Sequence, residues 1–316
     1  MLGLDDAGRT VLKAKKIAIF CHLNPDGDCI GSLLALGLAL RKLGKKIFMV
    51  SPDGLPHKYR ALPGAGLVKK RLTEKVDLAI TVDCNNKAML GEAFTDVRKA
   101  GVILEIDHHE FRKPFGNIAL IDTKAGAVGE IIFLLLKRLK VPISKDIAYN
   151  ILVSIIVETG SFRFPSYRAL TFHICAELTE KGIDFSRLSE LIYWSKTRQE
   201  LLLSGLCLSR CKFKKGGRII WSIAKRSDFK RIKGKDEHID AVADEMRAVK
   251  KVLIAVLFRE TSNGLLRVSF RSKGKVNVAR LAQAFGGGGH SDVAGCIVAN
   301  KPEVKKDILR QAEQLL

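Results

Sequence analysis

The sequence predicts an α/β protein with two domains: a parallel-sheet N-terminal domain and a smaller C-terminal α/β domain, joined by a linker helix. In the first 185 residues, short apolar runs alternate with helical patterns, which is typical of a parallel sheet with crossover helices. After residue 206 a second series of short strands and helices begins. The length of 316 residues suits two domains of ordinary size.

Short runs of apolar residues mark the expected strands of the N-terminal domain, and longer stretches with helical periodicity mark its helices. The strands are expected at 16–20, 46–50, 76–82 and 102–106. The helices are expected at 31–43, 126–140, 145–157 and 168–182. Because helices separate successive strands, we expect the strands to run parallel.

The pattern changes after residue 185. The segment 186–206 combines mixed charge with leucines at helical spacing, which predicts a linker helix. Beyond it, strands are expected at 218–224, 252–259 and 265–271, and helices at 236–250, 276–285 and 302–315. The chain is therefore divided into three parts, 1–185, 186–206 and 207–316.

The composition excludes several classes of protein. Hydrophobic residues make up 47% of the chain, so it can bury a core and is not disordered. The longest apolar runs, such as 131–136, are far shorter than the ~20 residues that cross a bilayer, and no membrane partner is expected. Asp5 and Asp6 precede any apolar run, which argues against a secretory signal and favours a cytoplasmic location.

The cysteines indicate neither disulfides nor a zinc site. There are seven of them, an odd number, and they are scattered along the chain. Cys207 and Cys211 lack the second pair or the nearby histidine that would complete a zinc site. We therefore expect reduced thiols, most of them buried.

The chain is strongly basic, with a net charge of +21 at pH 7. Such an excess attracts polyanions over roughly a Debye length, and salt screens the attraction. Nucleic acid or a nucleotide is the expected partner. The alternative is a solvated basic surface with no specific partner.

Acidic residues and histidines gather after three of the expected strands. Because the carboxyl ends of neighbouring parallel strands share one edge of a sheet, where α/β proteins bind ligands, we expect these side chains to converge. The first group lies between the strand 16–20 and a helix, the second follows 76–82 and the third follows 102–106. The residues are His22, Asp26 and Asp28, then Asp83, then Asp107, His108 and His109.

The mixture of ligand types predicts a metal centre. Asp26 and Asp28 place two negative charges in one turn, which is unfavourable unless a cation relieves it. Imidazole with carboxylate suits a transition metal, so Mn²⁺ is preferred over Mg²⁺. Two such ions ~3.5–4 Å apart promote phosphate-ester hydrolysis. A carboxylate at Asp83 can bridge two ions, while an ordinary strand end is the alternative for that residue alone.

The adjacent histidines are expected to have different tasks. Neighbouring side chains alternate in direction, so one of His108 and His109 can bind metal while the other faces the substrate. Asp107 can orient an imidazole from behind.

A run of four glycines in the C-terminal part predicts an anion-binding site. Glycines allow close backbone approach and positive φ angles, and their N–H groups can form a nest for a phosphate. A nearby arginine and histidine can add charge-assisted hydrogen bonds. The candidate substrate-binding residues are Arg271, Gly286, Gly287, Gly288, Gly289 and His290.

Two phenylalanines, Phe162 and Phe164, flank Arg163. We expect them to pack in the core, and stacking on bases is the alternative.

Together these motifs resemble the DHH phosphoesterase family. Asp107-His108-His109 and the spacing of His22, Asp26 and Asp28 match the family's metal-binding motifs. The segment 156–162 matches its fourth motif, and Arg271 with 286–295 matches the glycine-rich signature of the DHH-associated C-terminal domain. The match covers nearly the whole chain.

The resemblance implies roles for these residues. One metal ion would be bound by His22, Asp26 and Asp83, and a second by Asp28, Asp83, His108 and Glu158. Asp83 would bridge the two ions, and His109, with Asp107, would act on the scissile phosphate. The implied cofactor is a pair of Mn²⁺ ions, with Mg²⁺ or Co²⁺ as alternatives.

The chain departs from the family pattern at two positions. The family usually has Asp where Glu158 stands, so the site is expected to shift, to bind the second metal more weakly or to lose this ligand. The segment 127–130 lacks the Ser common three residues before Glu130, which is interpreted as a structural or supporting residue.

The resemblance implies a metal-dependent phosphodiesterase that degrades short RNA to mononucleotides and also removes the 3′-phosphate of 3′-phosphoadenosine 5′-phosphate, working as a homodimer, with the C-terminal domain gripping the substrate. The alternatives are a RecJ-like single-strand DNA exonuclease, an inorganic pyrophosphatase and a nucleotide-binding regulator with impaired catalysis. RecJ nucleases are usually much longer, and the pyrophosphatases lack the glycine-rich signature.

Overall fold

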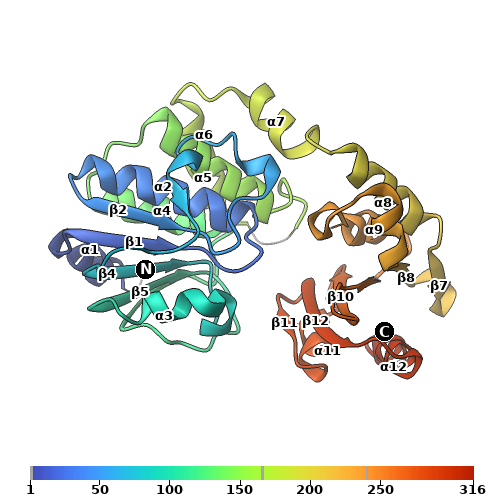
Figure 1. Ribbon diagram of the computed structural model, residues 1–316. Coiled ribbons are helices and arrows are strands. Elements are labelled where there is room, and N and C mark those ends of the chain that lie inside the picture. Colours follow the sequence, from blue (N-terminus) through green and yellow to red (C-terminus); the bar gives the residue numbers. More distant parts are fainter. Residues whose placement is uncertain (1–2, 165–166, 240) are drawn as a thin grey trace. The chain divides into compact units, whose positions relative to one another are not determined.

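The computed structural model describes residues 3–164, 167–239 and 241–316, which form two compact units, Met1–Ser195 and Lys196–Leu316 (Figure 1). Each unit contains one six-stranded sheet with helices packed on it, which confirms the predicted α/β class. Among the described residues, no helix has the length and apolar character needed to span a membrane. The boundary falls inside the segment 186–206, which was predicted as one linker helix and is two helices in the structure, α7 (Phe185–Tyr193) and α8 (Arg198–Leu208). The finer division at residues 185 and 206 stays a prediction.

The sheet of the first unit is entirely parallel, with the strand order β3-β2-β1-β4-β5-β6. Its strands are β1 (Lys16–Phe20), β2 (Lys46–Val50), β3 (Val68–Lys69), β4 (Leu78–Val82), β5 (Val102–Asp107) and β6 (Ile118–Ile121). Four of these coincide with the predicted strands to within two residues. The sequence did not reveal β3 and β6, which are short edge strands.

Helices cover both faces of this sheet. They are α1 (Leu4–Lys13), α2 (Gly27–Lys42), α3 (Phe94–Val97), α4 (Val128–Arg138), α5 (Lys145–Glu158), α6 (Ala169–Thr179) and α7 (Phe185–Tyr193). Alternate residues of β1 point to opposite faces: Ile17 and Ile19 join the core beneath α2, α4 and α5, whereas Ala18 and Phe20 join the core on the side of α3 (Figure 1).

Glycines bring the start of α2 against the end of α5. A Cβ atom on Gly31 would lie 2.5 Å from the carbonyl oxygen of Asn150, and one on Gly27 would lie 2.7 Å from a methyl group of Val157. Only glycine allows the two helices to approach this closely. The contact sets Asp28, in the first turn of α2, beside the end of α5.

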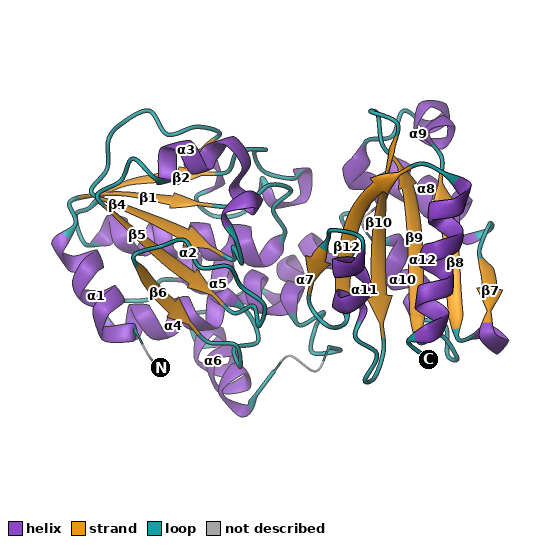
Figure 2. Ribbon diagram, turned by 90° about the horizontal axis from the view of Figure 1, so that it is seen from below, coloured by secondary structure: helices purple, strands orange, loops and turns teal. Residues whose placement is uncertain are grey.

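The second unit has a mixed sheet with the strand order β11-β12-β10-β9-β8-β7, in which β8 and β9 form the parallel pair. Its strands are β7 (Lys212–Lys214), β8 (Ile219–Ala224), β9 (Ile254–Glu260), β10 (Leu265–Ser272), β11 (Gly288–Gly289) and β12 (Val293–Ala299). Its helices are α8 (Arg198–Leu208), α9 (Arg226–Ile232), α10 (Val242–Arg247), α11 (Val278–Ala284) and α12 (Pro302–Gln314). Figure 2 shows helices on both sides of this sheet.

The helix predicted at 236–250 is shorter in the structure. A 3-10 helix, Asp236–Ile239, precedes α10, and residue 240 lies outside the described part of the chain. Ile239, Val242 and Met246 are nevertheless buried in one core. The apolar spacing therefore indicated the buried face correctly, although it overestimated the length of the helix.

Candidate metal centre and phosphate-binding residues

The carboxyl ends of β1, β4 and β5 lie side by side, because these strands are neighbours in the first sheet. Each strand end carries polar residues that the sequence analysis selected: His22 after β1, Asp83 after β4, and Asp107, His108 and His109 at the end of β5. All five side chains are buried or nearly so. The structure thus brings the three predicted groups together at one edge of the sheet.

Asp83 lies at the centre of this cluster. Its Oδ2 is 3.5 Å from Nε2 of His22, whereas its Oδ1 is 3.7 Å from Nε2 of His108 and 3.6 Å from Nδ1 of His109. The Oδ1 atom is buried and has no hydrogen-bond partner among the described residues. Two oxygens that face different imidazoles, one of them without a donor, fit a carboxylate that bridges two cations.

The backbone of Asp83 has the left-handed conformation, with φ of 60°. Its N–H donates to the carbonyl oxygen of Ile106 on β5, which holds the turn in place. This conformation costs most residues roughly 1–2 kcal/mol, whereas Asp adopts it more readily because its short polar side chain can hydrogen-bond locally. This turn directs the carboxylate of Asp83 into the cluster.

His108 faces three carboxylates at equal distances. Its Nε2 is 3.7 Å from oxygens of Asp28, Asp83 and Glu158, while its Nδ1 lies 3.2 Å from the carbonyl oxygen of Ala125. Burial lowers the pKa of His108, but the charges of Glu158, Asp28 and Asp83 outweigh it and raise the pKa to about 9. Separations of 3.7 Å are too long for direct hydrogen bonds and leave room for a cation among the four groups.

Asp28 is fully buried and is fixed by donors on three elements. Its Oδ1 accepts hydrogen bonds from the hydroxyls of Ser32 and Ser154 at 3.1 and 2.6 Å, and its Oδ2 accepts one from the N–H of Val128 at 2.9 Å. Burial, followed by the charge of Asp83, raises its pKa to about 7. The crowding of Asp28 and Asp83 is the electrostatic problem that a bound cation relieves.

The other two predicted ligands lie at the margin of the cluster. Asp26 is exposed and caps α2, with its Oδ1 accepting from the N–H of Cys29 at 3.0 Å. It belongs to none of the groups of three close ligand atoms found among the described residues. Glu158 ends α5, is partly exposed and reaches the cluster through His108. Burial raises the pKa of its carboxyl well above the ordinary value.

Replacing Glu158 tests whether this residue is a metal ligand. We expect Glu158→Gln, which keeps the shape but removes the charge, to weaken Mn²⁺ binding by about 10–100-fold, a loss on the scale measured for groups that support a metal site. Glu158→Asp restores the shorter carboxylate usual in the family and should keep most activity. Calorimetric titration of the metal-free variants with Mn²⁺ measures this. Equal Mn²⁺ affinity in Glu158→Gln and the parent would exclude Glu158 as a ligand.

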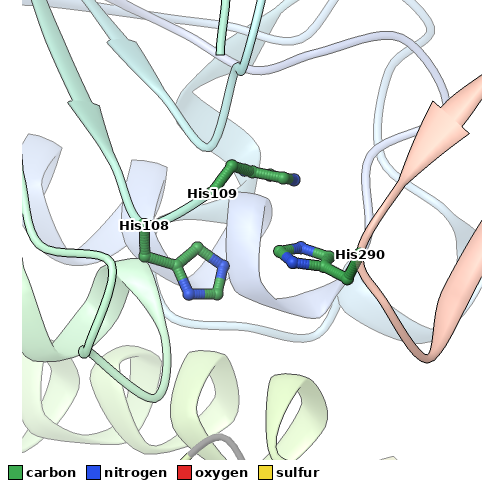
Figure 3. Close-up of side chains that lie close together, drawn as sticks. All are labelled: His108, His109 and His290. Atoms are coloured by element: carbon green, nitrogen blue, oxygen red, sulfur yellow. The ribbon is translucent and has the colours of Figure 1, made fainter. Parts of the chain in front are cut away.

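His109 is oriented by a buried chain of charged groups. Its Nδ1 lies 2.7 Å from Oδ1 of Asp107, and Oδ2 of Asp107 accepts from Nε of Arg112 at 2.7 Å. Arg112 also pairs with Glu105. The rings of His108 and His109 have centroids 5.3 Å apart and planes 69° apart (Figure 3). One nitrogen of each ring lies near Oδ1 of Asp83, at 3.7 Å for His108 and 3.6 Å for His109, so the different tasks expected of the two residues stay a prediction.

Several residues around the cluster were missed by the sequence analysis. Arg112 stands in a polar segment, with no pattern to set it apart. Cys29 has its thiol among the ligand atoms of His22 and Asp83. Burial raises the pKa of that thiol, so it stays protonated and donates to the carbonyl oxygen of Val82 at 3.5 Å. The sequence analysis predicted that most cysteines are buried thiols, but it did not place Cys29 beside the cluster.

A loop between β6 and α4 supports the cluster from outside. It supplies the Ala125 carbonyl next to His108, and the first residue of α4, Val128, supplies the N–H bound to Asp28. The fully buried Glu130 closes this loop by accepting from the N–H of Gly126 at 3.1 Å, and it also accepts from Arg168 at 2.5 Å. Glu130 thus has the contacts of a supporting residue, while its partner Arg168 was not foreseen.

The predicted phosphate-binding residues belong to the second unit. Arg271 lies on β10, where its Nε donates to Oδ1 of Asp244 at 3.1 Å and its guanidinium also bonds the carbonyl oxygen of Phe270. Its charge is therefore partly compensated within the unit. His290, which Figure 3 also labels, follows β11 and is partly exposed.

Two glycines of the run are required by close packing against β12. The N–H groups of Gly286 and Gly287 donate to carbonyl oxygens of α11, and that of His290 donates to Val293. A Cβ on Gly287 would lie 2.1 Å from the carbonyl oxygen of Gly295, because β12 passes close by. Only Gly286 and Gly289 have positive φ angles. A Cβ on Gly289 would lie 2.4 Å from the carbonyl oxygen of Val293, so Gly287 and Gly289 make room for β12, and phosphate binding by the run stays a prediction.

Comparisons with known proteins agree with this architecture. Residues 16–155 match the model of the DHH family, N-terminal domain, and residues 227–316 match that of the DHHA1 domain. The chain is 30% identical over 287 residues to the bifunctional oligoribonuclease and PAP phosphatase NrnA of Thermus thermophilus, covering 90% of this chain and 85% of that protein.

Two further similarities concern the fold and the metal. The crystal structure of an exopolyphosphatase-related protein from Bacteroides fragilis superposes with a TM-score of 0.89 at 25% identity, covering 98% of this chain and 95% of that one. A probable manganese-dependent inorganic pyrophosphatase of Streptococcus mutans is 27% identical over 179 residues, which is 54% of this chain and 56% of that protein.

The two domain matches account for most of the chain, and the full-length similarity extends over nearly all of it. The chain therefore belongs to the DHH phosphoesterase family, whose members are metal-dependent hydrolases of phosphate esters, and carries a DHHA1 domain in its C-terminal part.

Proposed function

We propose that this protein is a phosphodiesterase that degrades short oligoribonucleotides to mononucleotides and, as a second activity, removes the 3′-phosphate of 3′-phosphoadenosine 5′-phosphate. The observation that carries the proposal is the buried Asp83 carboxylate, whose two oxygens face His22 on one side and the His108–His109 pair on the other. The name of the Thermus relative supplies the substrate class.

The residues divide into two candidate sets of metal ligands. His22 and Asp83, with Asp26 at the margin, would hold one ion, whereas Asp28, Asp83, His108 and Glu158 would hold the other. The donor set of imidazole and carboxylate favours two Mn²⁺ ions, with Mg²⁺ or Co²⁺ as alternatives. When bound, such ions activate water and stabilise the leaving oxygen of a phosphate ester.

The chain itself contributes orientation and charge. Asp107, neutralised by Arg112, fixes the ring of His109 so that the other ring nitrogen can hydrogen-bond a phosphate oxygen. Burial opposes ionisation of Asp107, but the hydrogen bond and charge of His109 hold its pKa below the usual value. Asp107 therefore remains a carboxylate and a positioning group for His109.

The excess of basic over acidic residues is larger in the second unit than in the first, which favours a role for the second unit in holding the anionic substrate. Residues 196–316 contain 26 of the 54 Lys and Arg but only 12 of the 33 Asp and Glu. This excess attracts phosphates of any nucleic acid, in a manner that salt weakens. His290 and Arg271 are proposed to bind the substrate directly. A homodimer and a cytoplasmic location stay predictions.

The dependence on substrate length tests the proposed activity. We expect RNA of two and five nucleotides to be cleaved with a higher kcat/KM than RNA of 24 nucleotides, once salt screens non-specific attraction. Raising salt from about 50 to about 200 mM should weaken binding of the longest RNA most, because that binding neutralises the most phosphates. The measurement is kcat/KM for the three lengths at both salts with Mn²⁺ present.

A variant at His290, one of the predicted substrate-binding residues, completes this experiment. His290→Ala should reduce kcat/KM on dinucleotides and have a smaller effect on an artificial phosphodiester that has no second nucleotide. If the 24-nucleotide strand is the best substrate at both salts, the RecJ-like alternative replaces the proposal. If the protein binds nucleotides but turns over none of these substrates with Mn²⁺, the regulator alternative does.

A further inference from the structure

An aromatic cluster follows the last predicted metal ligand in the first unit. Phe162, Tyr167 and Phe172 contact one another: the ring centroids of Phe162 and Phe172 are 4.9 Å apart with planes at 30°, and Tyr167 meets both at steep angles. Phe162 packs against the main core, as predicted. Tyr167 and Phe172, however, are 43% and 46% exposed, which core packing does not explain.

The inner ring of the cluster is held by a strained turn. Ser161 and Phe162 both have left-handed backbones, with φ of 61° and 63°. The turn is fixed to the end of α5, because the N–H of Ser161 donates to the carbonyl oxygen of Ile156 and that of Phe162 to the hydroxyl of Thr159. Two successive left-handed residues persist only where the surroundings impose them. The turn therefore fixes Phe162 to the end of α5, the helix whose last residue is Glu158.

The outer rings are held from the other side by Arg168. This residue precedes α6 and pairs with Asp122 and the buried Glu130, the residue that closes the loop supporting Asp28 and His108. Phe172 follows Arg168 by one helical turn. The exposed rings are therefore anchored to the same framework as the predicted metal ligands, and ordering them on binding costs little conformational entropy.

The surroundings of the cluster favour an anionic aromatic ligand. Arg163 lies beside the strained turn and is exposed, and His173, next to Phe172 on α6, is also exposed. Phe172 contacts both Phe162 and Tyr167 and still keeps 46% of its surface exposed, so part of its ring is available to a ligand. An aromatic surface next to an arginine and an imidazole matches a nucleobase with its phosphate, since bases stack on aromatic side chains without sequence preference.

We propose that Phe162, Tyr167 and Phe172 form a platform on which a nucleobase of the oligonucleotide substrate stacks beside the metal centre. This inference rests on the proposed function, which supplies the oligonucleotide. Phe172 is the principal stacking residue, and Phe162 positions it. The platform would let the enzyme accept any short RNA, because every base presents a π face.

The test combines a protein change with a substrate change. Phe172→Ala and Phe172→Trp are compared with Phe185→Ala, a control at an exposed phenylalanine that is 44% accessible on the same unit and outside the cluster. The substrates are a diadenosine dinucleotide and two versions of it, each lacking one base. We expect Phe172→Ala to lower kcat/KM on the intact dinucleotide about tenfold, mainly through KM.

The same variant should have no effect on the abasic substrate that lacks the stacked base, and Phe172→Trp should retain activity. Unchanged kcat/KM in Phe172→Ala, or an equal loss on the intact and both abasic substrates, would overturn the platform while leaving the proposed function intact. A change of oligomeric state in Phe172→Ala, measured by light scattering, would overturn it too, because the cluster would then be an interface between copies. A parent protein that cleaves no oligonucleotide would instead overturn the proposed function itself.

Discussion

Asp83→Ala is expected to reduce kcat/KM by about 10³-fold or more, equivalent to ~4 kcal/mol of activation free energy, while the protein stays folded. The reason is geometric. Asp83 is the residue whose oxygens face His22 on one side and both His108 and His109 on the other, so its loss removes a shared ligand from both proposed metal positions. A change at any other proposed ligand affects one position only.

The left-handed backbone of Asp83 requires a second variant. Alanine at φ of 60° is itself strained, so part of the effect of Asp83→Ala could arise from a shifted turn. Asparagine tolerates this conformation and keeps the shape of the side chain while removing its charge. We therefore expect Asp83→Asn to match Asp83→Ala in lost activity and to match the parent more closely in melting temperature. Asp83→Asn activity within about tenfold of the parent would exclude the bridging role.

Exhaustive chelation is expected to abolish turnover, again by about 10³-fold or more, and Mn²⁺ should restore it better than Mg²⁺. The preference follows from the imidazole nitrogens of His22 and His108, which bind a transition metal better than they bind Mg²⁺. The buried pair Asp28 and Asp83, whose mutual repulsion a cation relieves, favours binding of the ion.

The metal should also stabilise the fold, which gives a measurement independent of catalysis. An ion that binds only the native state at 100 times its dissociation constant adds about 2.7 kcal/mol to the free energy of unfolding. Mn²⁺ is thus expected to raise the melting temperature of the chelated parent, and to raise that of Asp83→Asn much less. Full activity after chelation, or equal stabilisation of both proteins, would contradict a metal centre at Asp83.

The strands that carry the centre could be predicted because short apolar runs in the sequence indicate buried strands. β1, β4 and β5 are mostly apolar runs, and His22, Asp83 and His108 stand within two residues of their ends, so both the strand positions and the shared edge of their carboxyl ends could be deduced. The edge strands β3 and β6 could not, since each is short and is a strand only because a neighbour offers it hydrogen bonds. β11 is also short, and its two glycines have a low strand propensity, so the sequence did not indicate a strand there.

The residue types of the candidate centre were determined by the sequence alone: His22, Asp28, Asp83, His108 and their neighbours could be selected from spacing and strand context. The tertiary structure decided how they are used. Asp26 lies exposed at a helix cap and Asp28 is buried, although only one residue separates them. Arg112 and Arg168 gained roles as partners of buried carboxylates, and Gly287 and Gly289 proved to accommodate β12. Local sequence specifies which groups can bind a cation or a phosphate. Their burial, their distances and their unsatisfied charges arise only when segments far apart in the chain pack together.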